Sequence, residues 1–468
     1  MGQAETVELL PREIYRCLLG QEHAQNKDFW KEYEQRRTLL EIIGKSDQEA
    51  ADYCAMVMSK GQDALYYLTD GSKVEKEHII VFLDQYAQVI GRKRILELLE
   101  RVYPDLYAYL QPFRFEHDLL SQYFNIYTYA KAINKVLPDL VEIMEEQAVK
   151  REFNIMLKPR SELVDNIPKE NVTIFYMDAM GAEFISFINE KCYQKKLRPT
   201  IKVARCNLPS ITSVNKDFLE GFDQEKDIIP VKEIDDIKHR GKENYDYQYT
   251  KQPLHLIREL EIIDEVLDKA QQRLSIKPGH RVFLIADHGA TRMAVIMEHT
   301  LNIEVNAKGT YGGRVCKYTE EVADIPHACE ADGYCVLANY DRFKGGRKAS
   351  VEAHGGATLE EVTVPIIEIA AVPANMEIFI QTPLIQVSSR KKAEIQLFSK
   401  MPLQNVSILV NGSHYEAQTV DNHVFQVLMP DLRRTGTYSV DVYSNNHLVW
   451  RGLEFVVEKE GFKEIDLL

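Results

Sequence analysis

The side chains best suited to chemistry lie in the middle of the chain, directly after two apolar runs. Asp178 follows the run Val172–Met177. Asp287 and His288 follow the run Val282–Ala286. Carboxylate oxygens together with an imidazole nitrogen are ligands that suit Zn or Mn. An isolated Asp-His-Gly sequence is more typical of a polar loop, so this interpretation needs support from the segments that accompany it.

A stretch rich in hydroxyl and amide side chains lies between these two acidic segments. It contains Ser210, Thr212, Ser213 and Asn215. A hydroxyl bound to a metal ion has a lowered pKa and can attack phosphorus, so the stretch is a candidate source of a nucleophile. Taken alone, the stretch fits better a turn that caps a helix.

A further imidazole, that of His354, precedes a third apolar run at 362–372. The two glycines that follow His354 allow the backbone to approach a ligand closely, so His354 is a candidate metal ligand. Thr358 and Glu361 have the spacing of a capping box, which predicts that part of this segment begins a helix.

The elements that must position these residues form a predicted α/β core over 166–372. Its three runs are apolar on both faces, which is typical of strands in a parallel sheet that helices cover on both sides. An amphipathic helix is predicted over 256–274, because apolar residues there recur every three or four positions. Ligands in such folds gather outside the carboxyl ends of the strands, where Asp178 and Asp287 stand.

The two flanking regions have different patterns. Residues 1–165 carry helical apolar stripes, for example over 119–143, which predict an all-α N-terminal domain. Residues 373–468 contain short alternating segments and turn signals such as the Asn-Gly pair at 411–412, which predict a C-terminal β-sandwich of the Ig-like kind. Asp431, Gly436 and Tyr438 predict a tyrosine corner, which would be a structural feature.

The order of the chemical features along the chain is Asp, hydroxyl, Asp-His and His-Gly. This order resembles the alkaline phosphatase superfamily, and specifically its PglZ-domain branch. The phrases that carry the resemblance are Tyr176–Gly181, Pro209–Thr212, Ala286–Arg292 and His354–Glu361. The ordered set spans about 200 residues and is more specific than any single phrase. PglZ proteins are components of BREX phage-defence systems, and the helical front, α/β core and β-rich tail look like the shorter PglZ proteins of one BREX type.

The resemblance implies two divalent metal ions, with Zn favoured and Mn as the alternative. For the first ion it implies that Asp178, Asp287 and His288 are ligands. The hydroxyl of Thr212 would bind the same ion and act as the nucleophile, with Ser210 as the alternative nucleophile.

For the second ion the resemblance implies His354 as one ligand. The superfamily usually supplies the others as Asp-x-x-x-His, a spacing that Asp235 and His239 have in this chain. The residues before Asp235 do not have the pattern of an apolar strand, so an exposed polar loop is the competing interpretation. Asp246 and His255 are alternatives for the role. Two such ions stand about 3.5–4 Å apart and clamp the attacking and leaving oxygens of a displacement at phosphorus.

The nonbridging oxygens of a phosphate ester need cationic donors. Arg292 lies in the Asp-His phrase, and Arg342, Lys344 and Arg347 lie in a basic, glycine-bearing loop. Arg binds phosphate in a bidentate manner and Lys adds a point charge, so all four are candidates. The basic loop fits a solvated surface equally well.

Composition limits the remaining function classes. The 468 residues carry 57 Lys and Arg against 71 Asp and Glu, a formal net charge of −14. Nonspecific coating of nucleic acid needs a surplus of cations, so nucleic acid binding is expected only locally or through a partner.

No apolar run approaches the ~18–20 residues that span a bilayer, and the N-terminus lacks a signal-peptide pattern. Seven scattered cysteines without a Cys-x-x-Cys pair favour the reducing cytoplasm.

The sequence therefore predicts a cytoplasmic, metal-dependent phosphoric ester hydrolase, either a phosphatase or a phosphodiesterase. Its expected substrate is a phosphate ester or nucleotide, and its expected partners are other BREX defence proteins. One alternative is a catalytically weak scaffold that docks other defence proteins through its flanks. Another is a nuclease that cuts invading DNA, which the net charge disfavours.

Overall fold

The computed structural model describes residues 10–23, 27–43, 47–223, 225–240, 245, 250–276, 279–304, 311–322, 324–345, 351–372, 376–388 and 391–459. The chain divides into two compact units. One unit contains Met1–Phe187, Val203–Val266 and Leu284–Ile366, and the other contains Ile188–Lys202, Leu267–Phe283 and Ile367–Leu468. These units cut across the predicted boundaries at 165/166 and 372/373, so the division into three domains stays a prediction.

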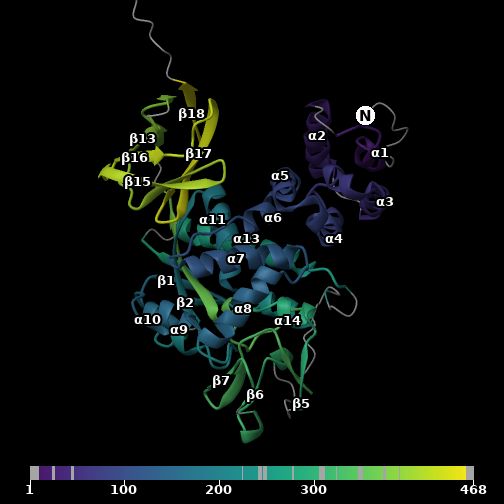
Figure 1. Ribbon diagram of the computed structural model, residues 1–468, viewed down its shortest axis with the longest axis vertical. Coiled ribbons are helices and arrows are strands. Elements are labelled where there is room, and N and C mark those ends of the chain that lie inside the picture. Colours follow the sequence, from purple (N-terminus) through teal and green to yellow (C-terminus); the bar gives the residue numbers. More distant parts are fainter. Residues whose placement is uncertain are drawn as a thin grey trace, which may run out of the picture. The chain divides into compact units, whose positions relative to one another are not determined.

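The N-terminal region is helical, as its apolar stripes predict (Figure 1). Its helices are α1 (Leu10–Arg16), α2 (Lys27–Ile43), α3 (Asp47–Met58), η2 (Gly61–Tyr67), α4 (Lys73–Ile90), α5 (Arg92–Val102), α6 (Pro104–Tyr109), α7 (Asp118–Ala132), α8 (Pro138–Lys150), α9 (Phe153–Met156) and α10 (Arg160–Val164). Local sequence explains several helix starts. The Ser72 side chain accepts a hydrogen bond from the Glu75 N–H at the start of α4. Pro104 and Pro138 are the first residues of α6 and α8, where a missing N–H costs little.

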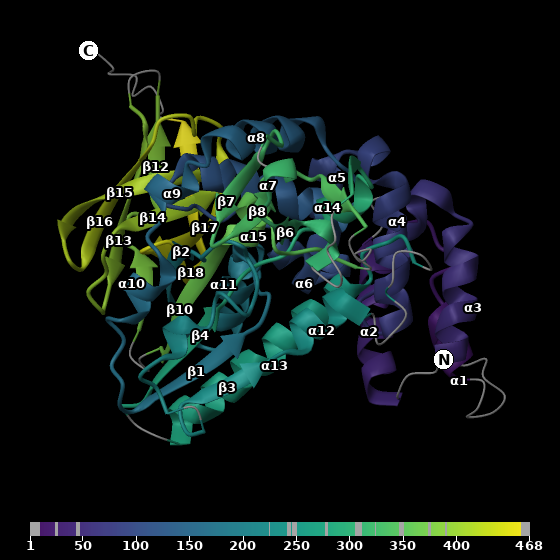
Figure 2. The same cartoon turned by 90° about the horizontal axis from the view of Figure 1, so that it is seen from below.

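The α/β core contains a five-stranded sheet with the order β2-β10-β4-β1-β3. Its strands are β1 (Val172–Met177), β2 (Leu197–Arg205), β3 (Ile228–Val231), β4 (Arg281–Ala286) and β10 (Thr363–Ala371), and Figure 2 shows β4, β1 and β3 as neighbouring arrows. The apolar runs thus form β1, β4 and β10, and the predicted amphipathic helix is α13 (His255–Ile276). β1 and β3 are parallel, with Met177 beside Val231, so both strands end at the same edge of the sheet.

The third apolar run, β10, is antiparallel to β4. The N–H of Gly289 donates to the Glu361 carbonyl at 2.9 Å, which joins the end of β4 to the start of β10. Arg281, at the start of β4, pairs at 2.6 Å with Glu368 farther along β10. A Cβ on Gly289 would lie 2.0 Å from the backbone oxygen of Glu360, so only glycine fits there. The prediction of a parallel sheet is therefore wrong for β10, because an apolar run does not specify strand direction.

Short strands between β4 and β10 were not predicted from the sequence. β5 (Thr300–Glu304) pairs with β9 (Arg342–Lys344), and β6 (Val315–Lys317), β8 (Tyr334–Leu337) and β7 (Ala328–Ala331) form a three-stranded sheet. Each strand has three to five residues, too few for an alternating pattern to stand out. The strands enclose a small core that includes Cys316, Val322, Leu337 and Phe343.

The C-terminal region forms one eight-stranded sheet with the order β11-β13-β16-β15-β14-β17-β18-β12. Its strands are β11 (Ile378–Ile380), β12 (Leu384–Val387), β13 (Ala393–Ser399), β14 (Val406–Val410), β15 (Ser413–Asp421), β16 (Val424–Met429), β17 (Gly436–Ser444) and β18 (His447–Lys459). β15 pairs with β14 through its first half and with β16 through its second, so it joins two half-sheets around one core. The Tyr438 hydroxyl donates to the Arg434 carbonyl at 2.8 Å, which confirms the tyrosine corner. The Ig-like classification stays a prediction.

Candidate metal centre

The ends of β1 and β4 bring Asp178, Asp287 and His288 together, and we call these residues the first cluster. One ligand atom from each residue lies within 4.8 Å of the others. His288 Nε2 is 3.9 Å from Asp178 Oδ1 and 3.5 Å from Asp287 Oδ2. All three side chains are buried, so water does little to screen their charges.

Asp287 is held in place by hydrogen bonds to both carboxylate oxygens. Its Oδ1 accepts from the backbone N–H groups of Ala179, at 3.1 Å, and His288, at 2.8 Å. Its Oδ2 accepts from the Tyr176 hydroxyl at 2.8 Å. The carboxylate is therefore oriented by the fold before any ligand binds.

The hydroxyl of Thr212 lies against the first cluster. Thr212 Oγ1 is 3.3 Å from Asp178 Oδ1 and 3.2 Å from His288 Nε2. Ser210, the alternative nucleophile, is fully buried, and its hydroxyl donates to the Gly356 carbonyl at 2.7 Å. Ser210 therefore supports the loop that carries His354, and its assignment as an alternative nucleophile is wrong.

Asp235, His239 and His354 form a second group of ligand atoms, which we call the second cluster. His239 Nε2 is 2.8 Å from His354 Nε2 and 3.2 Å from Asp235 Oδ1. His354 Nε2 is 3.6 Å from Asp235 Oδ1. The rings of His288 and His354 stack with their centroids 4.4 Å apart, so His288 stands between the two clusters.

α12 (Glu233–Arg240) positions two ligands of the second cluster. Asp235 and His239 are four residues apart and so share one face of this helix. α12 follows β3, whose end lies beside the end of β1. The strand before Asp235 that the apolar pattern did not indicate is therefore β3, which has only four residues, one of them Pro230. The exposed-loop interpretation of Asp235 and His239 is wrong.

Backbone contacts determine which imidazole nitrogen faces the clusters. His288 Nδ1 lies 2.9 Å from the Gly289 carbonyl, and His354 Nδ1 lies 3.2 Å from the Ser210 carbonyl. A carbonyl oxygen only accepts hydrogen bonds, so each Nδ1 carries a proton. In a neutral imidazole, Nε2 then presents its lone pair toward the cluster, which is the form that binds a metal ion.

The electrostatics of the two clusters favour a bound cation. Burial, followed by repulsion from Asp287 and Asp235, raises the pKa of Asp178 to about 8. Burial, followed by the charge of His288, holds the pKa of His354 well below its ordinary value, so its imidazole stays neutral. Burial opposes the ionisation of Asp235, but its contacts with His239 and His354 lower the pKa of this carboxyl.

The donor atoms fit divalent ions such as Zn or Mn. Asp235 Oδ1 is buried and has no hydrogen-bond partner, although the Nε2 atoms of His239 and His354 lie near it. Two imidazole nitrogens at 2.8 Å require a proton or a cation between them, and a cation also relieves the repulsion between the carboxylates of the first cluster. Carboxylate and imidazole donors are those that Zn and Mn accept.

The predicted phosphate cations have different outcomes in the structure. Arg292 is fully buried, and its guanidinium donates to two backbone carbonyls, so its assignment is wrong. Its place beside the Asp-His phrase in the sequence did not reveal where its side chain points. Arg342 and Lys344 lie in β9, which pairs with β5 and not with the strands that lead into the clusters. Arg347 lies outside the described residues.

Lys216 is a cation near the first cluster that the sequence reasoning missed. It is exposed and lies four residues after Thr212, in the same loop. Burial has the larger effect on the pKa of Asp178, but the charge of Lys216 acts on the same carboxyl and lowers its pKa. A search for basic residues near Thr212, as well as near the Asp-His phrase, would have found it.

A third group with metal-type ligands lies elsewhere in the core. It consists of His255, Glu259 and Glu352, all fully buried. The ammonium groups of Lys131 and Lys238 lie among these carboxylates at 2.6–3.2 Å, so we call the five residues the ammonium-matched cluster. His255 Nε2 contacts Glu352 at 2.9 Å, which rules out its alternative role in the second cluster. The other alternative, Asp246, lies outside the described residues.

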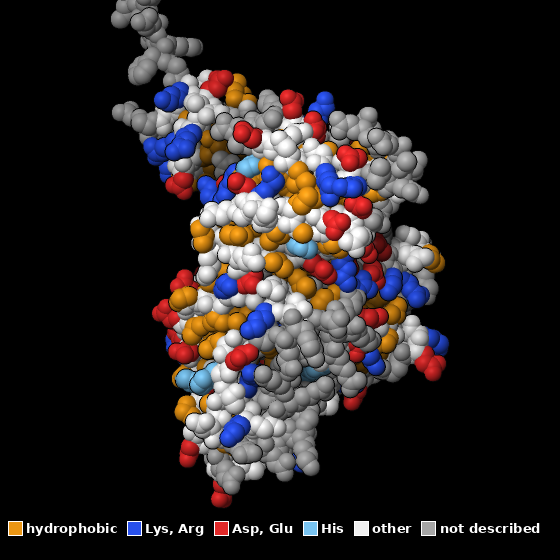
Figure 3. Space-filling model, turned by 90° about the vertical axis from the view of Figure 1, so that its right-hand side faces the viewer, with side chains coloured by type: hydrophobic (Ala, Val, Ile, Leu, Met, Phe, Trp, Pro, Cys, Tyr) orange, Lys and Arg blue, Asp and Glu red, His pale blue; other side chains and the backbone are white. Residues whose placement is uncertain are grey.

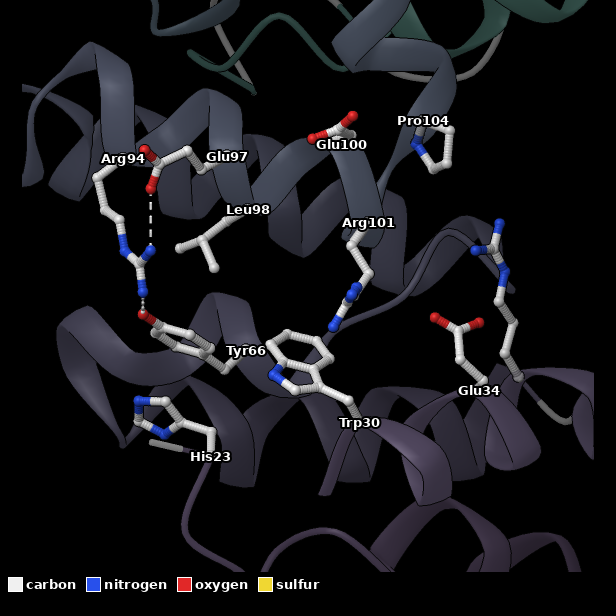
Figure 4. Close-up of a pocket in the computed structure, with 11 residues that line it drawn as sticks. His23, Trp30, Glu34, Tyr66, Arg94, Glu97, Leu98, Glu100, Arg101 and Pro104 are labelled. Carbon is white, nitrogen blue, oxygen red and sulfur yellow. Dashed lines mark hydrogen bonds and ion pairs between the residues drawn. The ribbon is translucent and has the colours of Figure 1, made fainter. Parts of the chain in front are cut away.

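A cavity of about 850 Å³ opens among the N-terminal helices (Figure 4). Arg101 lies over the ring of Trp30, 4.4 Å from its centroid. Arg94 pairs with Glu97 at 3.0 Å and contacts the hydroxyl of Tyr66. These cations are already engaged by neighbouring side chains. The two clusters remain the better candidate site.

The surface shown in Figure 3 mixes charges of both signs. Lys and Arg side chains are interspersed with Asp and Glu on this face. A surface that holds nucleic acid through its phosphates needs a continuous basic path, and the described side chains drawn on this face do not form one. Among the described helices, none has the length and apolar character needed to cross a bilayer.

Two family models match the ends of the chain. One is described as a domain of unknown function (DUF7863) and matches residues 1–86. The other is described as a domain of unknown function (DUF7862) and matches residues 376–460. No curated protein matches the chain. Both matches lie outside the segment that carries the two clusters.

Proposed function

We propose that this chain is a metal-dependent phosphoric ester hydrolase in which the hydroxyl of Thr212 attacks phosphorus. The observation that carries the proposal is the position of Thr212 Oγ1, within 3.3 Å of Asp178 and His288, beside two clusters that together hold six oriented ligands. Divalent ions bound there would lower the pKa of the hydroxyl and offset the negative charge of the phosphoryl group.

The residues of the chain provide the remaining parts of the reaction. Thr212 Oγ1 forms a bond to phosphorus as the bond to the leaving oxygen breaks, and water later releases phosphate from the threonine. The half-exposed His239 and the half-buried Thr212 mark the side from which a substrate can enter. Lys216, exposed in the same loop, is the candidate contact for a nonbridging oxygen.

We further propose that the protein acts in the cytoplasm as a PglZ-type component of BREX phage defence, together with other BREX proteins. The ordered phrases that resemble the PglZ branch support this proposal. The Asp, Thr and His side chains of these phrases lie together at one edge of the sheet, which also supports the proposal.

Hydrolysis of p-nitrophenyl phosphate and bis(p-nitrophenyl) phosphate, after loading with Zn or Mn, tests the proposed chemistry. Thr212→Ala should lower kcat at least about 100-fold, because it removes the nucleophile. Thr212→Ser keeps a hydroxyl and should retain part of the rate. Ser213→Ala, which removes a neighbouring exposed hydroxyl, is the matched control and should leave kcat unchanged. If Thr212→Ala turns over as fast as the unchanged protein, the hydrolase proposal fails. If the metal-loaded protein hydrolyses neither ester, the scaffold alternative is favoured.

A further inference from the structure

A buried lysine lies on the helix that positions the second cluster. Lys238 is on α12 between Asp235 and His239, and its side chain is fully buried. Its ammonium joins the ammonium-matched cluster, where it pairs with Glu259 at 3.1 Å and Glu352 at 3.2 Å. α12 therefore presents its metal-type ligands to the second cluster and its lysine to a separate group of charges.

Lys238 also contacts the segments that carry other ligands. Its ammonium donates to the backbone carbonyl of Ala179 at 2.8 Å. Ala179 is the residue immediately after Asp178, which belongs to the first cluster. Glu352, its ion-pair partner, lies two residues before His354. One buried ammonium thus links α12 to the turn after β1 and to the loop before β10.

The turn that Lys238 contacts has an unfavourable backbone conformation. Ala179 has a φ of 60°, a value that residues other than glycine rarely adopt. Its N–H donates to Asp287 Oδ1 at 3.1 Å, and its carbonyl accepts from Lys238. Ala179 thus makes one hydrogen bond to the first cluster and one to α12.

We propose that Lys238 is a positioning residue that fixes α12 against the turn after Asp178 and thereby forms the second metal position. This inference rests on the metal centre of the proposed function and adds the residue that aligns its two halves. Without the ammonium, α12 loses its bond to Ala179, and the ligands Asp235 and His239 lose their fixed distance from His354.

Lys131 provides the matched comparison. It is equally buried and pairs with Glu259 at 3.1 Å, as Lys238 does. It lies on α7, and its described ion pairs are with Glu183, Glu259 and Glu352. None of its described contacts is with the backbone beside a metal-type ligand. Lys238→Met/Glu259→Gln and Lys131→Met/Glu259→Gln each remove one buried cation and the Glu259 carboxylate, and only the first removes the bond to Ala179.

Zn²⁺ titration calorimetry of the metal-free full-length chain measures the difference. We expect the unchanged protein and Lys131→Met/Glu259→Gln to bind two ions per chain with similar affinities. We expect Lys238→Met/Glu259→Gln to keep one ion and to bind the second at least about tenfold more weakly, a change of about 1.4 kcal/mol. Thermal unfolding without metal verifies that both variants fold to a similar extent.

Each other outcome overturns the inference. If both double variants lose the second ion equally, the buried charges as a group support the metal position and Lys238 has no special role. If Lys238→Met/Glu259→Gln binds two ions as tightly as the unchanged protein, α12 does not need this lysine, and the proposed hydrolase is unaffected. If the unchanged protein binds no Zn²⁺, the proposed function itself fails. Should the methionine variants not fold, Lys238→Gln and Lys131→Gln form a second pair with the same expectations.

Discussion

The first cluster and the ammonium-matched cluster contain the same kinds of side chain, but they are neutralised differently. In the ammonium-matched cluster, Lys131 and Lys238 lie within 3.2 Å of the carboxylates. Burial raises the pKa of Glu352, yet these two ammonium groups hold it well below its ordinary range. In the first cluster, burial and neighbouring carboxylates raise the pKa of Asp178 to about 8.

This difference shows that residue types alone do not identify a metal site. Both groups offer carboxylate and imidazole atoms close enough to share an ion. In one group the fold already supplies the positive charge, so a metal ion would have to displace a buried lysine. In the first cluster, the ion pairs that Asp178 and Asp287 form among the described residues are with His288 and not with a lysine or arginine, and the buried guanidinium of Arg160 donates to the Asp287 backbone carbonyl instead. A metal ion is therefore the counter-charge that we propose for this group.

Removing a lysine from the ammonium-matched cluster should have the largest effect on stability. Lys131→Met leaves buried carboxylates without their cation, and we expect it to lower the free energy of unfolding by about 3–5 kcal/mol. Urea denaturation without metal measures this loss. Lys135→Met is the control, because its partly exposed pair with Asp84 should contribute about 1 kcal/mol or less. Equal losses in the two variants would mean that the buried charges are not matched as described.

Removing a charge from the first cluster should change the free energy of unfolding in the opposite direction. Asp178→Asn relieves repulsion from Asp287 and Asp235, and we expect it to raise the free energy of unfolding of the metal-free protein by about 2 kcal/mol at pH 8. Urea denaturation in a chelating buffer measures the gain. Added Zn should reverse the order, because the variant has lost a ligand. A metal-free variant less stable than the unchanged protein would contradict the charge imbalance.

The pH dependence of the free energy of unfolding should reveal the protonation of the Asp178 carboxyl. The pKa of Asp178 is about 8 in the folded protein, above its ordinary value of 3.8, so the folded state holds a proton that the unfolded state releases. Its contribution to stability is present below pH 4 and is lost as the pH rises toward 8, by up to about 1.4 kcal/mol per pH unit. Denaturation across this range should show a shallower decline for Asp178→Asn. Burial also raises the pKa of Glu183 and Glu360 to about 7, so the difference between the two proteins, and not the decline itself, is the test.

The smallest expected effect concerns the exposed cation beside the first cluster. Lys216→Ala should raise KM for p-nitrophenyl phosphate about tenfold with a smaller change in kcat, because one point charge near the phosphate is lost. Lys344→Ala is the matched control, since Lys344 is exposed in β9, which pairs with β5 and not with β1, β3 or β4. Steady-state kinetics would refute the assignment if both variants, or neither, raised KM.

The sequence predicted the metal-type ligands better than it predicted the cations that accompany them. Asp178 and Asp287 follow long apolar runs, so strand ends could be recognised without the structure. Asp235 and His239 follow a strand of four residues, and only their spacing suggested a role. Arg292 was predicted from its neighbours in the chain, but its guanidinium meets backbone groups that are distant in the sequence.

The direction of β10 could not be predicted for a related reason. An apolar run on both faces indicates a buried strand and carries no signal for its orientation. Because β10 is antiparallel to β4, the loop before it lies at the edge where β4 ends, and this places His354 beside His288. The resemblance to a known family predicted this meeting, whereas the pattern of apolar residues did not.

Anomalous diffraction from crystals of the Zn-loaded protein, together with its metal content, tests the central claim most directly. We expect two ions per chain, one among Asp178, Asp287 and His288 and one among Asp235, His239 and His354. We expect no anomalous peak at His255, Glu259 and Glu352, where ammonium groups already supply the positive charge. A Zn-saturated protein with no peak at either of the first two positions, or with its peak in the ammonium-matched cluster, would contradict it.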